Sequence, residues 1–213
     1  MTEEDVIDVM KRTGALITND HLIYTSGRHG STYINKDAIF PHTKEISALC
    51  RELAGRFAHD QVHVIIAPAV GGVILSQWTA HHLSSLTGTE VLALYAEKTQ
   101  DGKGFMITRG HDAFIPGNRI LVVEDNLTTG SSVLKVINAV REHEGNVIGL
   151  GALCNRGGVT AADVGDIPKL EALVNLNLDS WAAQECPLCK QGIPINTKLG
   201  KGKNLVEATP LQS

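Results

Sequence analysis

Two adjacent acids and a run of threonine, glycine and serine lie between an apolar segment and a helical one. Glu124 and Asp125 end the apolar segment, and Thr128 to Ser132 precede the helical one. Backbone N–H groups and hydroxyls at a helix N-terminus favour phosphate, and Gly130 lets the backbone approach it closely. Carboxylates at the carboxyl end of a parallel strand lie in the usual ligand crevice, where they can accept hydrogen bonds from vicinal hydroxyls. The segment therefore predicts a site for a ribose 5-phosphate.

The same segment has a simpler interpretation, in which the acids cap the next helix and the hydroxyls only shape the turn. The whole string ILVVEDNLTTGSSV, residues 120–133, is more specific than that. It resembles the 5-phosphoribosyl-1-pyrophosphate signature of the type I phosphoribosyltransferases. The resemblance implies contacts with this substrate from an unbroken series of residues: Glu124, Asp125, Asn126, Leu127, Thr128, Thr129, Gly130, Ser131 and Ser132.

The elements around this segment predict how it is held. Apolar runs typical of strands buried on both faces occur at residues 62–68, 91–96, 119–125 and 146–154. Segments with helical periodicity lie before and between these runs, at residues 43–58, 71–86 and 131–145. Such alternation predicts an α/β fold with a doubly wound, mostly parallel sheet flanked by helices.

The resemblance extends this prediction to the rest of the chain. It implies a single phosphoribosyltransferase domain over residues 1–213 with the type I phosphoribosyltransferase fold. A small hood is expected from about residues 1–40 and 178–195, and the polar stretch from about 196 to 213 is expected to form a tail.

A second segment bears on the acceptor of the phosphoribosyl group. Residues 21–40, HLIYTSGRHGSTYINKDAIF, resemble the N-terminal segment of orotate phosphoribosyltransferases, in which a Ser-Gly-Arg turn precedes a strand that lines the base. Arg28 and Lys36 in this segment either contribute positive charge to the site or are solvated surface residues. The resemblance implies that the base is bound by Thr25, Tyr33, Ile34, Thr128 and Arg156.

Arg156 follows the fourth predicted strand, at the position where orotate enzymes hold the carboxylate of the base. A guanidinium pairs with a carboxylate through two parallel hydrogen bonds, so this arginine favours orotate over adenine or hypoxanthine. A surface salt bridge to Asp163 or Asp166 is the alternative role.

The sequence APAVGG, residues 67–72, follows a predicted strand and resembles the pyrophosphate loop of the family. In that loop backbone amides face the diphosphate, sometimes next to a non-proline cis peptide bond. The resemblance places Val70 and Gly71 at the pyrophosphate, whereas a tight turn needed only for packing is the alternative.

Residues 97–118 are long, polar and rich in glycine, which is typical of a functional lid or a small hairpin. Within them residues 97–110 resemble the mobile catalytic loop of orotate enzymes, with Lys98 at the position of the catalytic lysine. Lys103 and Arg109 are further candidates, and Lys103 is also expected to contact 5-phosphoribosyl-1-pyrophosphate. In relatives this loop covers the active site of the other subunit, so we expect a homodimer. A solvated surface loop is the alternative.

The resemblance implies transfer of the phosphoribosyl group of 5-phosphoribosyl-1-pyrophosphate to orotate, which gives orotidine 5′-phosphate and pyrophosphate. Lys98 would stabilise the leaving group and Asp125 would fix the ribose, while Mg²⁺ would be bound mainly through the substrate. Relatives carry lysine-containing motifs where this chain has Thr25 and Val70–Gly71, so transfer to another base is an alternative. A nucleotide-binding regulator without turnover is a second one.

The composition limits the other partners. A net charge of −4 provides no general positive field for nucleic acid, and no apolar run reaches the roughly 20 residues of a membrane helix. Four cysteines are too few for a disulfide scaffold, so a cytoplasmic location is expected. Cys186 and Cys189 form a single CxxC motif without a second motif of metal ligands. We therefore expect no protein-bound metal there, and a structural pair that could form a disulfide.

Overall fold

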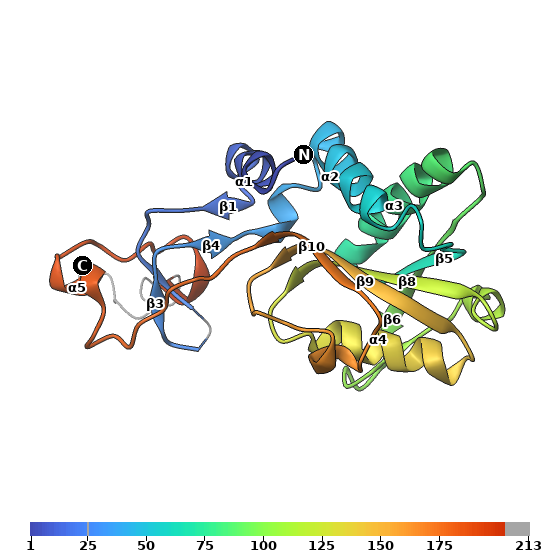
Figure 1. The fold of residues 1–213 in the computed structure, drawn as a ribbon. Coiled ribbons are helices and arrows are strands. Elements are labelled where there is room, and N and C mark those ends of the chain that lie inside the picture. The colour runs from blue at the N-terminus through green and yellow to red at the C-terminus, as the bar shows by residue number, and fades with distance from the viewer. Residues whose placement is uncertain (25, 203–213) are drawn as a thin grey trace, which may run out of the picture.

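The computed structural model of the chain describes residues 1–24 and 26–202. Its centre is a six-stranded sheet in the order β10-β9-β8-β5-β6-β7, in which only the β6–β7 pair is antiparallel (Figure 1). The strands of this sheet are β5 (Val64–Pro68), β6 (Leu92–Lys98), β7 (Phe105–Met106), β8 (Arg119–Leu127), β9 (Asn146–Asn155) and β10 (Leu170–Asn175). The prediction of a doubly wound, mostly parallel sheet is confirmed.

Helices cover both faces of the sheet. They are α2 (Thr43–Arg56) and α3 (Gly71–Thr87) on one face and α4 (Ser131–Glu142) on the other (Figure 1). Alternate residues of β5 enter different cores, because Ile65 packs with α2 and α3 whereas Val64 and Ile66 pack with α4. A strand that is buried on both faces must be apolar at successive positions, which explains its unbroken apolar sequence.

Helix starts follow local signals. The helix α1 (Glu3–Arg12) begins with a capping box, in which Thr2 and Asp5 each accept a hydrogen bond from the other's backbone N–H. Helix α4 begins after Gly130, which has a φ of 71°. A Cβ atom at this glycine would lie 2.6 Å from Val164, so both the conformation and the space require glycine.

A small lobe lies beside the sheet (Figure 1). It contains two-residue strands and one short helix, β1 (Leu16–Ile17) paired with β4 (Tyr33–Ile34), β2 (Leu22–Ile23) paired with β3 (His29–Gly30), and α5 (Pro187–Lys190). The N-terminal and C-terminal parts of this lobe contact each other, since His29 and Trp181 exchange two backbone hydrogen bonds of 2.8 Å. Within the predicted hood of about residues 1–40 and 178–195, we use the name hood from here on for the described residues 20–24, 26–31 and 181–196.

One element differs from the sequence patterns, and the structure decides a second that they left open. The edge strand β10 was not predicted, because its first three residues are only partly buried and carry no continuous apolar signal. Residues 97–110 form the β6–β7 hairpin, whose turn is closed by a 3.1 Å hydrogen bond from the Thr99 N–H to the Gly104 carbonyl. The structure therefore confirms that this segment is a hairpin, while its closure over the active site of a partner subunit stays a prediction.

Thr25 and the end of the predicted tail, residues 203–213, lie outside the described residues.

Candidate active site

The predicted site residues meet at the carboxyl edge of the parallel strands. In the register of β5 with β6, Pro68 lies opposite Ala96, and in that of β8 with β9, Leu127 lies opposite Asn155. The segments that leave these strands therefore start at the same edge. They carry Val70 and Gly71, Lys98, the loop 128–132, and Arg156.

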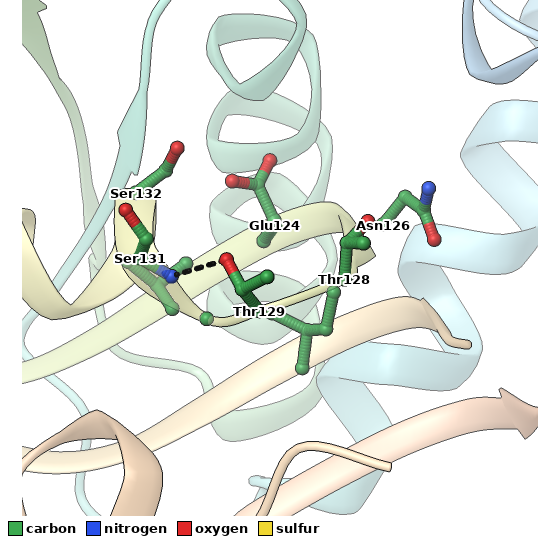
Figure 2. A pocket seen from close by; sticks show the side chains of 9 residues that line it. Glu124, Asn126, Thr128, Thr129, Ser131 and Ser132 are labelled. Carbon is green, nitrogen blue, oxygen red and sulfur yellow. Dashed lines mark hydrogen bonds between the residues drawn. The ribbon is translucent and has the colours of Figure 1, made fainter. Parts of the chain in front are cut away.

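The loop after β8 encloses a hollow at the N-terminus of α4. Its lining consists of Glu124, Asn126, Leu127, Thr128, Thr129, Gly130, Ser131, Ser132 and Val133. Figure 2 shows the side chains of Glu124, Ser131 and Ser132 on one side of the loop, while Asn126 points away from them. The Thr129 hydroxyl accepts a 3.4 Å hydrogen bond from the Ser131 N–H. The hollow thus combines hydroxyls with the positive end of a helix dipole, a suitable environment for a phosphate.

The acid pair is buried and close to one lysine. Glu124 is 9% exposed and Asp125 5% exposed, and the Lys36 ammonium donates a 3.0 Å hydrogen bond to Oδ2 of Asp125. Burial and the charge of Asp125 raise the pKa of Glu124 to about 8. Burial also raises the pKa of Asp125, although Lys36 partly opposes that effect. One cation therefore faces two carboxyl groups whose pKa values are both raised by burial.

Lys36 is the main site residue that the sequence patterns left undecided. It is separated from Asp125 by 89 positions, so neither spacing nor periodicity connects the two. Burial lowers the pKa of Lys36, but the charges of Asp125 and Glu124 outweigh this effect and raise it overall. The lysine is therefore charged beside the acid pair, although its side chain is still 46% exposed.

The predicted pyrophosphate loop touches the acid pair. A Cβ atom at Gly71 would lie 2.8 Å from Oδ2 of Asp125, so the backbone and the carboxylate approach as closely as glycine allows. The Ala69–Val70 peptide bond is cis, and the Val70 side chain is 85% exposed at the start of α3. The backbone of the predicted pyrophosphate loop and the acid pair therefore lie beside the same part of the candidate site.

The structure brings Arg156 to the phosphate loop. Its Nε donates a 3.2 Å hydrogen bond to the Thr128 hydroxyl, so two of the residues predicted to bind the base are adjacent. Buried Asn155 holds the turn after Arg156 through two hydrogen bonds to the backbone of Val159, of 2.9 and 3.0 Å. Tyr24, which sequence patterns did not single out, is also near: burial raises the pKa of its hydroxyl, and the charge of Arg156 partly opposes this.

Close packing of this turn gives the first prediction. A Cβ atom at Gly157 would lie only 1.6 Å from the carbonyl oxygen of Thr128, which is backbone and cannot swing away. We expect Gly157→Ala to displace Arg156 from Thr128 and to lower the free energy of unfolding by about 1–3 kcal/mol. Urea unfolding of this variant is compared with that of Gly158→Ala, where the space is open but φ is 62°. Equal effects would indicate that backbone conformation and not the contact with Thr128 matters.

The two predicted base contacts on β4 have different environments. Ile34 is 8% exposed and belongs to the core, where it borders a small apolar cavity together with Lys36 and Asp125. Tyr33, the neighbouring residue, is partly buried and points to the other side of the strand. Ile34 therefore packs in the core next to Asp125. Contact of Tyr33 or Ile34 with a base stays a prediction.

The charged residues of the β6–β7 hairpin divide into two groups. Lys98 and Lys103 are exposed and form no salt bridge with any described residue. Arg109 instead donates hydrogen bonds of 3.1 and 2.9 Å to the two carboxylate oxygens of Glu97, and these bonds hold the pKa of Glu97 below its usual value. Arg109 therefore braces the hairpin, and the two lysines are free to meet an anion.

The expectation of no metal at Cys186 and Cys189 depended on motif spacing alone and stays untested. The structure places His21 and His29 against these cysteines, with all four ligand atoms within 4.8 Å of one another. The histidines come from the β2–β3 hairpin, about 160 positions before the cysteines. Sequence spacing could not reveal this group, because the two halves of the hood meet only in the folded chain.

The site and the fold together define a class of protein: an α/β protein with a hollow suited to a sugar phosphate at the carboxyl edge of its sheet and an acid pair beside that hollow. No helix among the described residues is long and apolar enough to cross a membrane.

Comparisons with known proteins agree with this class. The family model of the phosphoribosyl transferase domain matches residues 37–185. The orotate phosphoribosyltransferase of Pelotomaculum thermopropionicum is 41% identical over 194 residues, which cover 91% of this chain and 95% of that protein. The orotate phosphoribosyltransferase of Thermus thermophilus is 37% identical over 191 residues, covering 90% and 98%. The chain therefore belongs to the phosphoribosyl transferase family and, within it, to the orotate phosphoribosyltransferases.

Solved structures resemble the fold as well. Orotate phosphoribosyltransferase of Mycobacterium tuberculosis in complex with 5-phospho-α-D-ribosyl 1-diphosphate has a TM-score of 0.63 and 19% identity, covering 82% of this chain and 96% of that one. The enzyme from Aeropyrum pernix has a TM-score of 0.61 and 22% identity, with coverage of 80% and 93%. At these identities the likeness concerns the fold.

Proposed function

We propose that the protein transfers the phosphoribosyl group of 5-phosphoribosyl-1-pyrophosphate to orotate, forming orotidine 5′-phosphate and releasing pyrophosphate. The observation that carries this proposal is the adjacency of Arg156 and Thr128, whose side chains lie 3.2 Å apart. A cation able to hold the carboxylate of the base thus stands directly beside the loop that suits the sugar phosphate. The curated relatives of this chain carry the name of the same activity.

The 5-phosphate is expected at the loop 128–132. Backbone N–H groups at the start of α4 and the hydroxyls of Thr129, Ser131 and Ser132 line that hollow. The ribose hydroxyls then reach Glu124 and Asp125, and the diphosphate reaches the backbone of Val70 and Gly71. Asn126 and Leu127 shape the same loop from within β8. Each part of the substrate meets groups of suitable charge or hydrogen-bonding capacity.

Catalysis is expected to depend on position and charge. Orotate N1 attacks the anomeric carbon while the bond to pyrophosphate breaks, positive charge develops on the sugar, and the N1 proton passes to the departing pyrophosphate or to solvent. The buried acid pair lies beside this charge, and Lys98, with Lys103 as a second cation, neutralises the departing pyrophosphate. Lys36 keeps Asp125 oriented through its 3.0 Å hydrogen bond.

Mg²⁺ fits this arrangement as part of the substrate complex. Over residues 1–24 and 26–202, no group of three or more acids, histidines or cysteines gathers at the carboxyl edge of the sheet. The diphosphate and the ribose hydroxyls would then be the main ligands, with Asp125 and Glu124 close by. Bound in this way, Mg²⁺ would neutralise part of the charge of the diphosphate.

We further propose that the active enzyme is a homodimer. Lys98 and Lys103 are exposed on the hairpin, and neither lysine forms a salt bridge with a described residue of this chain. Both lysines are therefore available to a neighbouring active site. Mixing a Lys98→Ala subunit with an Asp125→Asn subunit tests this directly. Recovery of activity in the mixture indicates action across the interface, whereas its absence indicates action within one subunit.

The acceptor is tested by the release of pyrophosphate with orotate, uracil, adenine or xanthine. We expect turnover with orotate, and we expect Arg156→Ala to raise the KM for orotate about 100-fold because it removes a charge-assisted pair of hydrogen bonds. Arg12→Ala, at an exposed arginine of α1, is the matched control. Turnover with another base, or tight orotate binding without product, would replace this assignment with one of the two alternatives.

A further inference from the structure

We propose that the hood holds one structural zinc ion, bound by His21, His29, Cys186 and Cys189. These residues lie outside the candidate active site and have no part in the proposed reaction. Their ligand atoms gather within 4.8 Å in a chain that contains only four cysteines. The inference does not depend on which base the enzyme accepts.

The distances between the ligand atoms match a tetrahedral zinc site. Nε2 of His21 lies 2.9 Å from Nδ1 of His29 and 3.6 Å from each of the two sulfur atoms, and Nδ1 of His29 lies 3.3 Å from Sγ of Cys189. Zinc with ordinary bond lengths separates neighbouring N and S ligands by roughly 3.3–3.8 Å. These four separations lie within about half an ångström of that range, and the remaining two do not exceed 4.8 Å, so a small closing movement would bring the four atoms around a central ion.

The hydrogen bond made by one ring nitrogen of His21 leaves its other ring nitrogen available to a metal. Its Nδ1 lies 2.7 Å from the carbonyl oxygen of Ile193, and because a carbonyl only accepts, the proton must be on Nδ1. Nε2 is therefore a bare lone pair, directed at His29 and both cysteines. One lone pair accepts one hydrogen bond, so three neighbours around it are better explained by a shared ion. A backbone carbonyl that orients the outer nitrogen is a common feature of histidine ligands.

The ligand set selects the metal and its role. Two imidazoles and two thiolates in a CxxC spacing are typical of tetrahedral zinc sites. His21, His29 and Cys186 are 1%, 6% and 0% exposed, and all four positions are protein ligands, so no position is left for water or substrate. A closed and mostly buried site is structural.

The construction of the hood explains why an ion is needed. Its strands β2 and β3 have two residues each and α5 has four, which gives little regular structure to hold them together. Leu22 and Cys186 are fully buried, yet neither belongs to the two hydrophobic cores of the chain. Small units without a sufficient core are commonly held by a metal. The ion would connect residues about 160 positions apart and so fasten the chain's C-terminal part to its N-terminal part.

Metal analysis of the whole protein, purified without a chelator or a histidine tag, tests the proposal. We expect one zinc ion per chain by mass spectrometry of the elements, and cobalt substitution should give the absorption of a tetrahedral ion with thiolate ligands. Cys189→Ser and His29→Ala should lose the metal, whereas His29→Cys, which supplies another zinc ligand, should retain it. Cys50→Ala removes a thiol of the sheet core and should leave the zinc content unchanged.

Removal of the ion should act locally. After treatment with a chelator, amide exchange should increase at least tenfold in residues 20–31 and 181–196, with β5 and β8 still protected. Zinc-free wild-type protein, iron in place of zinc, zinc content independent of Cys189, or a Cys186–Cys189 disulfide would each overturn the proposal. The wild-type metal content and cobalt spectrum decide the question even if the variants fail to fold.

Discussion

Glu124→Gln is expected to make the folded chain more stable at and above neutral pH while it removes most of the activity. Burial and the charge of Asp125 raise the pKa of Glu124 from 4.5 to about 8 in the folded chain. Between these values the folded state binds more protons than the unfolded state, so the free energy of unfolding falls as the pH rises. Glutamine cannot ionise, so its variant does not lose this part of the free energy of unfolding as the pH rises.

The stability difference should depend on pH in a defined way. We expect the variant and the parent to be similarly stable near pH 4, where Glu124 is protonated in both states. Above about pH 8 the variant should gain on the order of 1–3 kcal/mol, measured by urea unfolding across the range. Glu142→Gln, at an exposed glutamate of α4, is the control and should show no such trend. A gain that is the same at every pH would contradict the assigned role of charge.

Activity should change in the opposite direction. The ribose hydroxyls lose a carboxyl acceptor in Glu124→Gln, and this acceptor is charged above its pKa of about 8. A preorganised charge in a buried site contributes on the order of 100-fold to turnover, so we expect kcat/KM to fall by about that factor above about pH 8. Retention of full activity would mean that the acid pair only stabilises the loop, as in the simpler interpretation of this segment.

The second large effect is expected from Lys98→Ala. Lys98 ends β6 at the same edge as the acid pair, and it is exposed and without a salt bridge to the described residues. If it neutralises the departing pyrophosphate, its removal lowers kcat about 100- to 1,000-fold with a small change in KM. Pre-steady-state measurement of pyrophosphate release separates this chemical step from product release.

The stability of the chain should hardly respond to this change. Exposed side chains outside packed contacts usually alter the free energy of unfolding by less than about 0.5 kcal/mol, so thermal unfolding should be unchanged. Lys11→Ala, an exposed lysine of α1, should leave both kcat and stability unchanged. Lys98→Arg should restore part of the rate because the positive charge returns. An unchanged kcat in Lys98→Ala would leave Lys103 as the candidate.

Most of the sheet could be predicted because its signals are local. Strand β5 is apolar at successive positions and α4 follows its glycine directly, so each element carries its own evidence. The edge strand β10 lacks this evidence, since its first three residues are only partly buried. The 97–110 segment allowed two interpretations, and its hairpin depends on pairing of Lys98 with Phe105.

The amino-acid sequence by itself determined the phosphate loop and the acid pair, because the strand, the turn and the helix that form this site are continuous in the chain. Only the tertiary structure decided which distant groups join them. Lys36 reaches Asp125 and Arg156 reaches Thr128 through the packing of separate segments, and the hood unites histidines with cysteines about 160 positions away. Local patterns encode the conformation of neighbouring residues, whereas contacts between distant segments depend on the packing of the whole chain.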